Sequence, residues 1–306
     1  MDIVCCTDTN YIPHCGTMLV SLFENNRNGN ITIHLLHNNL SKKDQAALHN
    51  IVEKMYNQHI IFYPLKDDLL ATFPATNSYV SLAAYSKLFI ANLLPPTIKK
   101  ALYLDCDIMV VNTLRKLWEY DLTGIAMAAV KDVHKGIYED CKRLNINYKK
   151  EGYYNSGVMM LNLDYWRKMN FLEIALKFVE ENHSNLYYHD QDVLNGVLHG
   201  HILTLPYRYN LHDFLFHRKR YLETEDVFIA EQELCPDKRT IIHFSSKRKP
   251  WGTRCLHPLR KLYFLYLDKT EWRNRLPQYT FKDICWRWNR TLSGWLHWVN
   301  GYRNIK

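Results

Sequence analysis

One nearly uninterrupted apolar run, ALYLDCDIMVV at residues 101–111, constrains the fold more than any other feature of the sequence. Strands buried on both faces are continuously apolar, and they occur mainly in parallel sheets that helices cover on both sides. The same run carries two carboxylates, Asp105 and Asp107. Burying a charge is costly unless a partner or a metal compensates it. The run therefore predicts a core strand of an α/β sheet that ends at a polar site.

The first half of the chain alternates between strand and helix patterns. Strands are predicted at DIVCCT, ITIHLLH, HIIFYPL and ALYLDCDIMVV, with helices between them at 11–26, from the N-cap Ser41 to Met55, and at 79–94 before two prolines. The second half is more mixed, with strand patterns at GIAMAAV, SGVMMLNL and RTIIHF. This order predicts a mostly parallel central sheet flanked by helices. The composition, 47% hydrophobic and 23% charged over 306 residues, allows the large core that such a fold needs.

Polar side chains follow two of the predicted strands. Asp8 and Asn10 come directly after the first strand, and Asp105 and Asp107 end the run described above. Ligands of open α/β sheets bind beyond the carboxyl ends of the strands, so these clusters are expected to form one site. Residues two apart in a strand point the same way, which predicts that Asp105 and Asp107 share a face and that Cys106 points to the other.

The carboxylate pair is a candidate metal site. Two carboxylates this close repel one another, and a divalent cation such as Mg²⁺ or Mn²⁺ removes the repulsion while leaving positions open for substrate phosphates. His243 ends another apolar strand, and an imidazole ligand favours Mn²⁺. The basic residues 247–249 suit a diphosphate. The alternatives are two acids on a solvated strand end and a basic surface loop after an ordinary strand; the apolar flanks of the acidic pair favour the site.

Two further polar clusters could bind sugar hydroxyls. Asn155 lies at the mouth of the apolar strand SGVMMLNL, and the segment HDQD contains Asp190, Gln191 and Asp192. The alternative for the second cluster is structural, with Asp190 or Asp192 acting as the N-cap of the helix that follows.

Taken in order, these motifs resemble family 8 of the glycosyltransferases, which includes bacterial lipopolysaccharide galactosyl- and glucosyltransferases and glycogenin. The matching segments span about residues 1–270 and read MDIVCCTDTNYIPHCGTMLVSL, AAYSKLFIANLLP, ALYLDCDIMV, YYNSGVMMLNLDYWR, HDQDVLNG and HFSSKRKPW. The resemblance implies a catalytic domain of the GT-A (nucleotide-diphospho-sugar transferase) fold over 1–270. It also implies a UDP-galactose or UDP-glucose donor, Mn²⁺, retention of anomeric configuration, and a glycan or lipid-linked saccharide acceptor in lipopolysaccharide or surface-glycan synthesis.

The resemblance also implies roles for individual residues. The implied metal ligands are Asp105, Asp107 and His243, and the implied contacts to the donor are Asp8, Asn10, Val80, Lys87, Asp105, Asn155, Asp190, Gln191 and Lys249. Gln191 is expected near the anomeric carbon, and Asp190 is the carboxylate candidate for a nucleophile apart from the metal ligands. We favour front-face attack without a covalent intermediate. Lys87 replaces an arginine that is common in the family, so it loses the bidentate fork.

The last segment, 271–306, differs from the rest of the chain. It carries seven Lys/Arg against two Asp/Glu and five of the eight tryptophans. Apolar residues recur there with helical spacing and cations lie elsewhere on the wheel, the pattern of a helix that lies in an anionic membrane interface. The alternatives are a helix that packs on the core of the enzyme itself and a dimer contact.

Other features bound the location and the rival functions. The sequence begins with an apolar strand pattern, contains no run long enough to span a bilayer and has eight cysteines without a C-x₂-C pair. We therefore expect no signal peptide, reduced thiols and a cytoplasmic enzyme peripheral to the inner face of the membrane. A nucleotidyltransferase normally has a Gly-rich basic signature that CCTDTNYIPHCG lacks. A nucleic-acid binder, which could use the basic aromatic tail, would leave the acidic pair and His243 without a role.

Overall fold

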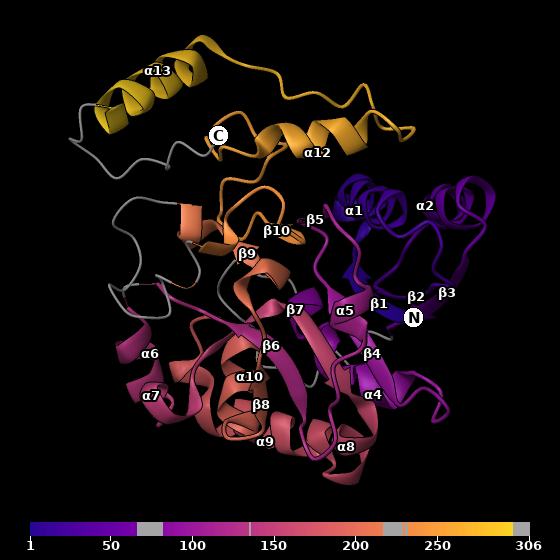
Figure 1. Ribbon diagram of the computed structural model, residues 1–306, viewed down its shortest axis with the longest axis vertical. Coiled ribbons are helices and arrows are strands. Elements are labelled where there is room, and N and C mark those ends of the chain that lie inside the picture. Colours follow the sequence, from indigo (N-terminus) through magenta and orange to yellow (C-terminus); the bar gives the residue numbers. More distant parts are fainter. Residues whose placement is uncertain (66–81, 135, 217–228, 230–231, 296–306) are drawn as a thin grey trace.

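A seven-stranded sheet forms the centre of the molecule. The computed structural model describes residues 1–65, 82–134, 136–216, 229 and 232–295 (Figure 1). The strand order is β3 (His59–Pro64), β2 (Thr32–His37), β1 (Asp2–Thr7), β4 (Lys100–Leu104), β7 (Tyr154–Asn162), β6 (Met127–Lys131) and β8 (Ile202–Thr204). Only β7 of these seven runs antiparallel to its neighbours. The predicted mostly parallel α/β sheet is therefore confirmed.

Helices cover both faces of this sheet. Successive side chains of each strand point to opposite faces of the sheet and into two different cores. Ile3 and Leu102 belong to one core, and Val4 and Tyr103 belong to the other. The first core lies under α1 (Ile12–Glu24), α2 (Lys42–His49) with its π-helical extension Asn50–Met55, and α12 (Arg260–Leu267). The second lies under the 3₁₀ helix Leu82–Phe89, α4 (Ile90–Leu93), α8 (Leu163–Lys168), α9 (Phe171–Asn182) and α10 (Asp190–Leu198). The other short helices of the described residues are α5 (Arg115–Trp118), α6 (Ile137–Arg143), α7 (Tyr148–Glu151) and the 3₁₀ turns Thr9–Tyr11, His183–Asn185, Tyr207–Tyr209 and Asp213–Phe216.

One local prediction is confirmed and another only in part. Ser41 caps α2, because its hydroxyl accepts a hydrogen bond from the backbone N–H of Asp44 at 3.1 Å. The predicted helix at 79–94 begins outside the described residues; its described part consists of 3₁₀ turns followed by the single turn α4, and it ends before Pro95.

The run ALYLDCDIMVV forms two strands rather than one. After β4 the chain turns at 105–107 and continues as β5 (Ile108–Val110), which belongs to a second sheet with the order β5, β10 (Ile241–His243), β9 (Leu211–His212). Both strands are fully buried apart from Lys100, which explains the continuous apolar pattern. The prediction of one strand was wrong at this point, because the second sheet begins as soon as the polar turn ends.

The C-terminal segment is attached by an aromatic anchor and by polar contacts. Trp272 packs against α1 where Gly16 leaves room; a Cβ on Gly16 would lie 2.3 Å from the Trp272 ring. Farther along, α13 (Phe281–Trp295) lies above α12 and β10 in Figure 1. The division of the chain at residue 270 stays a prediction. Among the described helices, none has the length and apolar character needed to cross a bilayer.

Candidate active site

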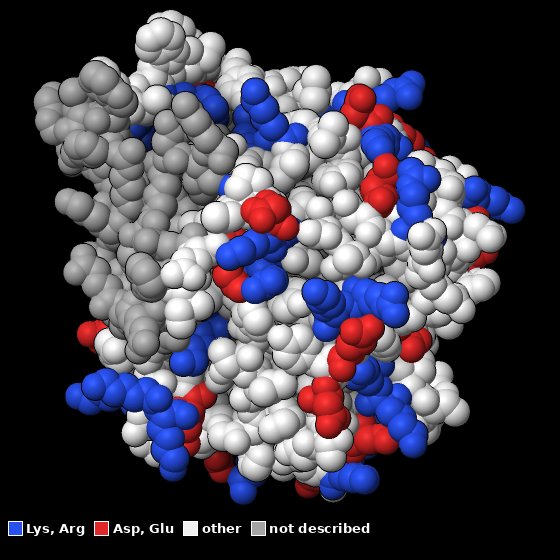
Figure 2. All heavy atoms as spheres, in the orientation of Figure 1, with Lys and Arg blue, Asp and Glu red and all other residues white. Residues whose placement is uncertain are grey.

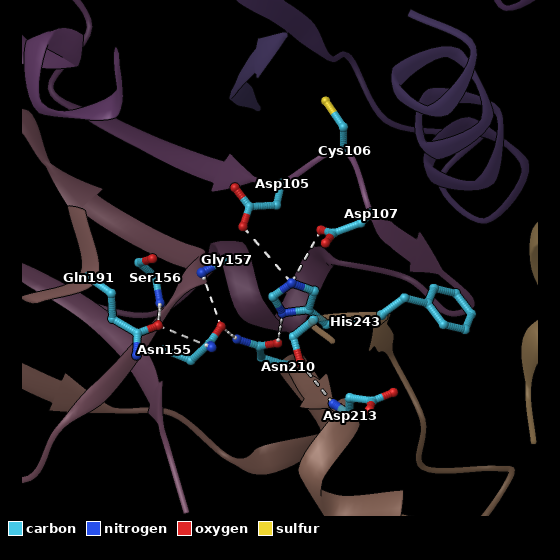
Figure 3. A network of polar contacts seen from close by, with 12 residues as sticks. Asp105, Cys106, Asp107, Asn155, Ser156, Gly157, Gln191, Asn210, Asp213 and His243 are labelled. Atoms are coloured by element: carbon cyan, nitrogen blue, oxygen red, sulfur yellow. Dashed lines mark hydrogen bonds and ion pairs between the residues drawn. The ribbon is translucent and has the colours of Figure 1, made fainter. Parts of the chain in front are cut away.

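The turn after β4 and the end of β10 bring two carboxylates and one imidazole together. Nε2 of His243 lies 3.2 Å from Oδ1 of Asp107 and 3.9 Å from Oδ2 of Asp105 (Figure 3). One possible ligand atom of each residue lies within 4.8 Å of those of the other two. Cys106 points away, and its thiol donates to the carbonyl of Cys6 at 3.2 Å. The prediction that these three residues converge is correct. Asp105 and Asp107 reach His243 from a turn, however, and not through the alternation of side chains along a strand.

A glycine on β7 makes room for this group, and the sequence interpretation missed it. A Cβ on Gly157 would lie 2.2 Å from Cε1 of His243 and 3.0 Å from Oδ2 of Asp105. The carbonyl of Gly157 also accepts a hydrogen bond from the backbone N–H of Asp105 at 2.9 Å. The sequence does contain a signal for it, because Gly157 is the one glycine of strand β7. A glycine inside a strand often marks a position where another group approaches the backbone closely.

The electrostatics of Asp107 suit a cation. Burial alone raises its pKa, but Lys249 and His243 beside it outweigh burial and hold the pKa well below its ordinary value. Nζ of Lys249 lies 2.5 Å from Oδ2 of Asp107 and donates to the carbonyl of Phe244 at 2.9 Å. Oδ1 of Asp107 is buried and has no hydrogen-bond partner among the described residues. A buried, ionised oxygen beside an imidazole nitrogen and a second carboxylate fits a divalent cation such as Mn²⁺.

Lys87 joins the acidic turn to α10. Burial by itself lowers the pKa of Lys87, but Asp105 and Asp190 outweigh burial and raise it. Its Nζ lies 2.8 Å from Oδ2 of Asp190 and 3.4 Å from Oδ1 of Asp105, and the side chain is 6% exposed. Asp190 also accepts from the hydroxyl of Ser156 at 2.9 Å. The N-cap alternative for Asp190 and Asp192 is wrong, because His189 occupies that position and both aspartates lie in the first turn.

The predicted amides form one buried cluster with an aspartate that was not predicted. Oε1 of Gln191 accepts from Nδ2 of Asn155 at 3.2 Å and from the backbone N–H of Ser156 at 3.1 Å. Nε2 of Gln191 donates to Oδ2 of Asp132 at 3.3 Å. Burial raises the pKa of Asp132, but His212 and His134 together with these amide donors lower it overall. Asp132 directly follows β6, so the strand-end rule applied to Asp8 could have found it.

Asp192 supports this cluster from behind. It is fully buried and accepts from the guanidinium of Arg143 at 3.0 Å and from the hydroxyl of Tyr153 at 2.7 Å. The backbone N–H groups of Tyr187 and Tyr188 also donate to it, at 2.6 and 2.9 Å. This aspartate therefore orders the segment that leads into Asp190 and Gln191.

The strand next to β4 supplies the other predicted contacts. Asp8 follows β1, and its Oδ1 accepts from the backbone N–H groups of Asn10 and Tyr11 at 2.8 and 3.1 Å. Asn10 is exposed, and the ring of Tyr11 is 38% exposed and meets Trp251 edge-on at 5.7 Å. Because β1 and β4 are parallel neighbours, these residues and Asp105 lie at the same edge of the sheet. Val80 lies outside the described residues.

Comparison with solved structures defines the class of fold. The galactosyltransferase LgtC, in a complex with donor and acceptor sugar analogues, superposes with a TM-score of 0.79 at 24% identity, over 90% of this chain and 100% of that one. The bifunctional glycosyltransferase WbbM gives a TM-score of 0.74 at 21% identity, over 90% of this chain and 51% of that one. The fold is therefore GT-A.

Sequence comparison shows the family. Residues 2–255 match Glycosyl transferase family 8, and the chain belongs to that family. Similar proteins are General stress protein A of Bacillus subtilis, 30% identical over 89% of this chain and 94% of that protein, and the lipopolysaccharide 1,2-glucosyltransferase of Escherichia coli K12, 29% identical over 89% of this chain and 78% of that protein. The resemblance stated from the motifs is confirmed, and the protein is a glycosyltransferase by family and fold.

Proposed function

We propose that the chain is a retaining, Mn²⁺-dependent hexosyltransferase that moves galactose or glucose from a UDP-sugar to a saccharide acceptor. One observation carries the proposal: Asp105, Asp107 and His243 converge within 4.8 Å, with Lys249 paired to one of them. When bound there, the metal supplies positive charge against the negative charge that develops on a departing diphosphate. The imidazole favours Mn²⁺ over Mg²⁺, and Lys249 adds a second, fixed cation for the diphosphate.

The remaining residues divide the donor between them. Asp8 and Asn10 are proposed to bind the uridine, and the half-exposed ring of Tyr11 beside them offers a face for the base. Asn155, Asp190 and Gln191 are proposed to hydrogen-bond the sugar, with Gln191 near the anomeric carbon. Lys87 holds Asp190 in place through the 2.8 Å ion pair, so its first role is to orient that carboxylate.

The contacts of Asp190 support front-face attack. In that reaction the bond from C1 to the phosphate oxygen breaks, a bond from the acceptor oxygen to C1 forms on the same face, and the acceptor proton passes to the leaving phosphate. A double-displacement route needs a carboxylate free to attack C1. Oδ2 of Asp190 is already engaged by Lys87 and Ser156. Detection of a glycosyl-enzyme adduct on Asp190 by mass spectrometry, absent in Asp190→Asn, would overturn front-face attack.

The acceptor is proposed to be a lipid-linked saccharide of lipopolysaccharide or surface-glycan synthesis. Support comes from the name of the Escherichia coli relative, a lipopolysaccharide glucosyltransferase. Because lipid-linked acceptors lie at a membrane, the proposal includes a cytoplasmic enzyme that associates peripherally with the inner face of the cell membrane. We propose no nucleic-acid partner, because such a partner would leave Asp105, Asp107 and His243 without a role; on the face drawn in Figure 2, Lys and Arg lie interspersed with Asp and Glu.

α13 is the proposed membrane contact. Its inner face is polar: Arg254 donates to Asp283 at 2.9 Å, and Arg287 donates to the carbonyls of Thr253 and Cys255 at 2.9 and 2.7 Å. Its outer face carries an apolar stripe, which consists of Phe281, Ile284, Trp288 and Leu292, all at least 43% exposed. A helix that packed its apolar face on the enzyme would have the reverse orientation. A test must distinguish membrane binding through this stripe from self-association of the protein through the same stripe.

A panel of UDP-hexoses tests the proposed chemistry. The purified chain is incubated with each donor and a lipopolysaccharide-core acceptor, with Mn²⁺, with Mg²⁺ or with EDTA. Release of UDP should require metal and one hexose, and NMR of the product should show the donor's anomeric configuration. Formation of a UDP-sugar from UTP and a sugar 1-phosphate would instead identify a nucleotidyltransferase. Metal-independent transfer, or an inverted product, would contradict the proposal.

A further inference from the structure

We propose that Asn210 is a positioning residue that holds His243 in the tautomer whose Nε2 lone pair faces Asp105 and Asp107. Asn210 is fully buried between the 3₁₀ turn Tyr207–Tyr209 and β9. Its Oδ1 lies 2.9 Å from Nδ1 of His243, and its Nδ2 lies 2.8 Å from Oδ1 of Asn155 (Figure 3). The inference rests on the proposed metal site and adds a residue that neither the motifs nor the ligand set includes.

The direction of these hydrogen bonds is fixed by the backbone of β7. The N–H of Gly157 can only donate, and it points at the Asn155 side chain at 3.1 Å. The Asn155 atom that receives this bond must therefore be the carbonyl oxygen, Oδ1. Since Asn210 meets the same oxygen, it must do so with its NH₂ group.

The orientation of Asn210 then decides the tautomer of the histidine. With its NH₂ group turned to Asn155, Asn210 presents its carbonyl oxygen to Nδ1 of His243. A carbonyl oxygen accepts only, so Nδ1 must carry the proton. In a neutral imidazole the other nitrogen, Nε2, then has a free lone pair, which is the form that binds a metal.

A second backbone donor confirms the orientation of Asn155 independently. The N–H of Ser156 donates to Oε1 of Gln191, which makes that atom an acceptor. The Asn155 atom that meets Oε1 at 3.2 Å must then be Nδ2, leaving Oδ1 on the other side. Two consecutive backbone N–H groups of β7 thus assign both amides, and the assignment extends to His243 through Asn210.

The alternative tautomer would compete with the metal. A proton on Nε2 would point at Oδ1 of Asp107, 3.2 Å away, and would occupy an oxygen that has no hydrogen-bond partner among the described residues. It would also remove the lone pair that a cation needs. By favouring the proton on Nδ1, Asn210 keeps both atoms available as ligands. Partners that hydrogen-bond a metal-binding histidine in this way typically change metal affinity 10- to 100-fold when they are removed, and we expect about this range here.

The test measures the tautomer and the metal affinity separately. Asn210→Leu removes both hydrogen bonds at similar volume, and Asn210→Asp keeps an acceptor for Nδ1 but loses the donor to Asn155. Asn26→Leu is the matched control: Asn26 is 8% exposed and is hydrogen-bonded to Leu22 and Leu114, away from the site. ¹⁵N NMR of the metal-free full-length chain reports which nitrogen of His243 is protonated, and calorimetric titration with Mn²⁺ alone reports affinity.

In the wild type and in Asn210→Asp we expect a proton on Nδ1. In Asn210→Leu we expect a shift of the proton toward Nε2 and a Mn²⁺ affinity lower by about 10- to 100-fold. The control should lose stability without either change. An unchanged tautomer and an unchanged Mn²⁺ affinity in Asn210→Leu would overturn the proposal. A neutral His243 with its proton on Nε2 in Asn210→Asp would also overturn it. The aspartate variant therefore decides the role of Asn210 if the leucine variant does not fold. If the wild type binds no Mn²⁺, the proposed function fails, while the NMR result still decides the role of Asn210.

Discussion

The site at the carboxyl edge of the sheet and helix α13 both reverse the usual distribution of side chains, but in different ways. The site buries charge: Lys87, Asp107 and Asp190 are each at most 9% exposed, yet each has an oppositely charged partner within the chain. The outer face of α13 exposes apolar side chains, and Trp288 is 77% exposed. Buried charges that compensate one another form a preorganised site, whereas an exposed apolar stripe gains free energy only when something covers it.

The largest effect should follow removal of one buried charge that the chain alone does not fully satisfy. Asp107→Asn keeps the shape of the side chain and removes its charge, so Mn²⁺ binding should be lost. The proposed transfer should then fall by about 1,000-fold, equivalent to about 4 kcal/mol of lost transition-state stabilisation. Calorimetry and UDP release measure the two effects. Asp164→Asn, on α8, is the control, and Mn²⁺ binding that survived in Asp107→Asn would remove Asp107 from the ligand set.

A buried charge that the chain does satisfy should matter for stability. Lys87→Met leaves Asp190 and Asp105 without their cation, and breaking a buried ion pair from one side costs about 3–5 kcal/mol. Urea unfolding should therefore give a lower free energy for Lys87→Met, and Lys87→Arg should recover most of it. Lys100→Met is the comparison, because the hydrogen bonds of Lys100 to described residues go to the carbonyls of Trp118 and Tyr120 and not to a carboxylate. Equal losses in the two methionine variants would mean that the pairing with Asp190 is unimportant.

The apolar stripe of α13 should affect membrane binding and leave stability unchanged. Phe281→Ser with Trp288→Ser removes two exposed apolar side chains, each worth about 1.5 kcal/mol if lipid buries it, so partition onto anionic vesicles should fall about 100-fold. Vesicle sedimentation measures the partition, and Met55→Ser, 47% exposed at the end of the π-helical segment Asn50–Met55, is the control. Unchanged partition would exclude the membrane role, and a change in mass by light scattering would identify a dimer contact instead.

Substitutions on the outer face are a better test than deletion of the tail. Arg287 and Asp283 of α13 bind the segment 253–255, and Arg248 stacks on the ring of Trp286 at 4.9 Å. Lys249, which pairs with Asp107, directly follows Arg248 in the sequence. A deletion would therefore disturb the diphosphate side of the site together with the membrane contact, and the two effects could not be separated.

Sequence predicted most strands because they depend on short-range apolar patterns, and the ordered family motifs predicted that Asp105, Asp107 and His243 converge. The apolar runs located the strands along the chain, and the carboxylates in the run after Ala101 singled out Asp105 and Asp107. Asp132 was missed although it directly follows β6, whereas Gly157 and Asn210 were missed because their roles depend on contacts between elements far apart in the chain. The turn at 105–107 was missed for a related reason: two buried strands in succession have the same apolar pattern as one, and only the pairing of β5 with β10 separates them. The orientation of α13 could not be predicted either, since a helical wheel does not say which face the enzyme covers.

The smallest effect concerns the segment that joins the two regions. Trp251 lies between Lys249 and Arg254, and its ring stacks on His14 with centroids 3.5 Å apart and planes 9° apart. Burial, assisted by the nearby charge of Arg275 and opposed by Asp107, lowers the pKa of His14 to about 4.

A histidine with a lowered pKa in the folded state binds protons more readily when the chain unfolds. Its contribution to stability is therefore complete above the unfolded pKa of about 6.5 and is lost as the pH falls toward 4, by at most about 3 kcal/mol. Urea unfolding at pH 7.5 and pH 4.5 should reveal a loss in the wild type that is smaller in His14→Gln and His14→Phe. The phenylalanine variant keeps an aromatic ring for Trp251, so it separates the effect of protonation from the loss of stacking. A loss of the same size in all three proteins would assign the pH dependence to other groups and leave His14 to contribute through its stacking on Trp251 and its hydrogen bond with the hydroxyl of Tyr263 at 2.7 Å.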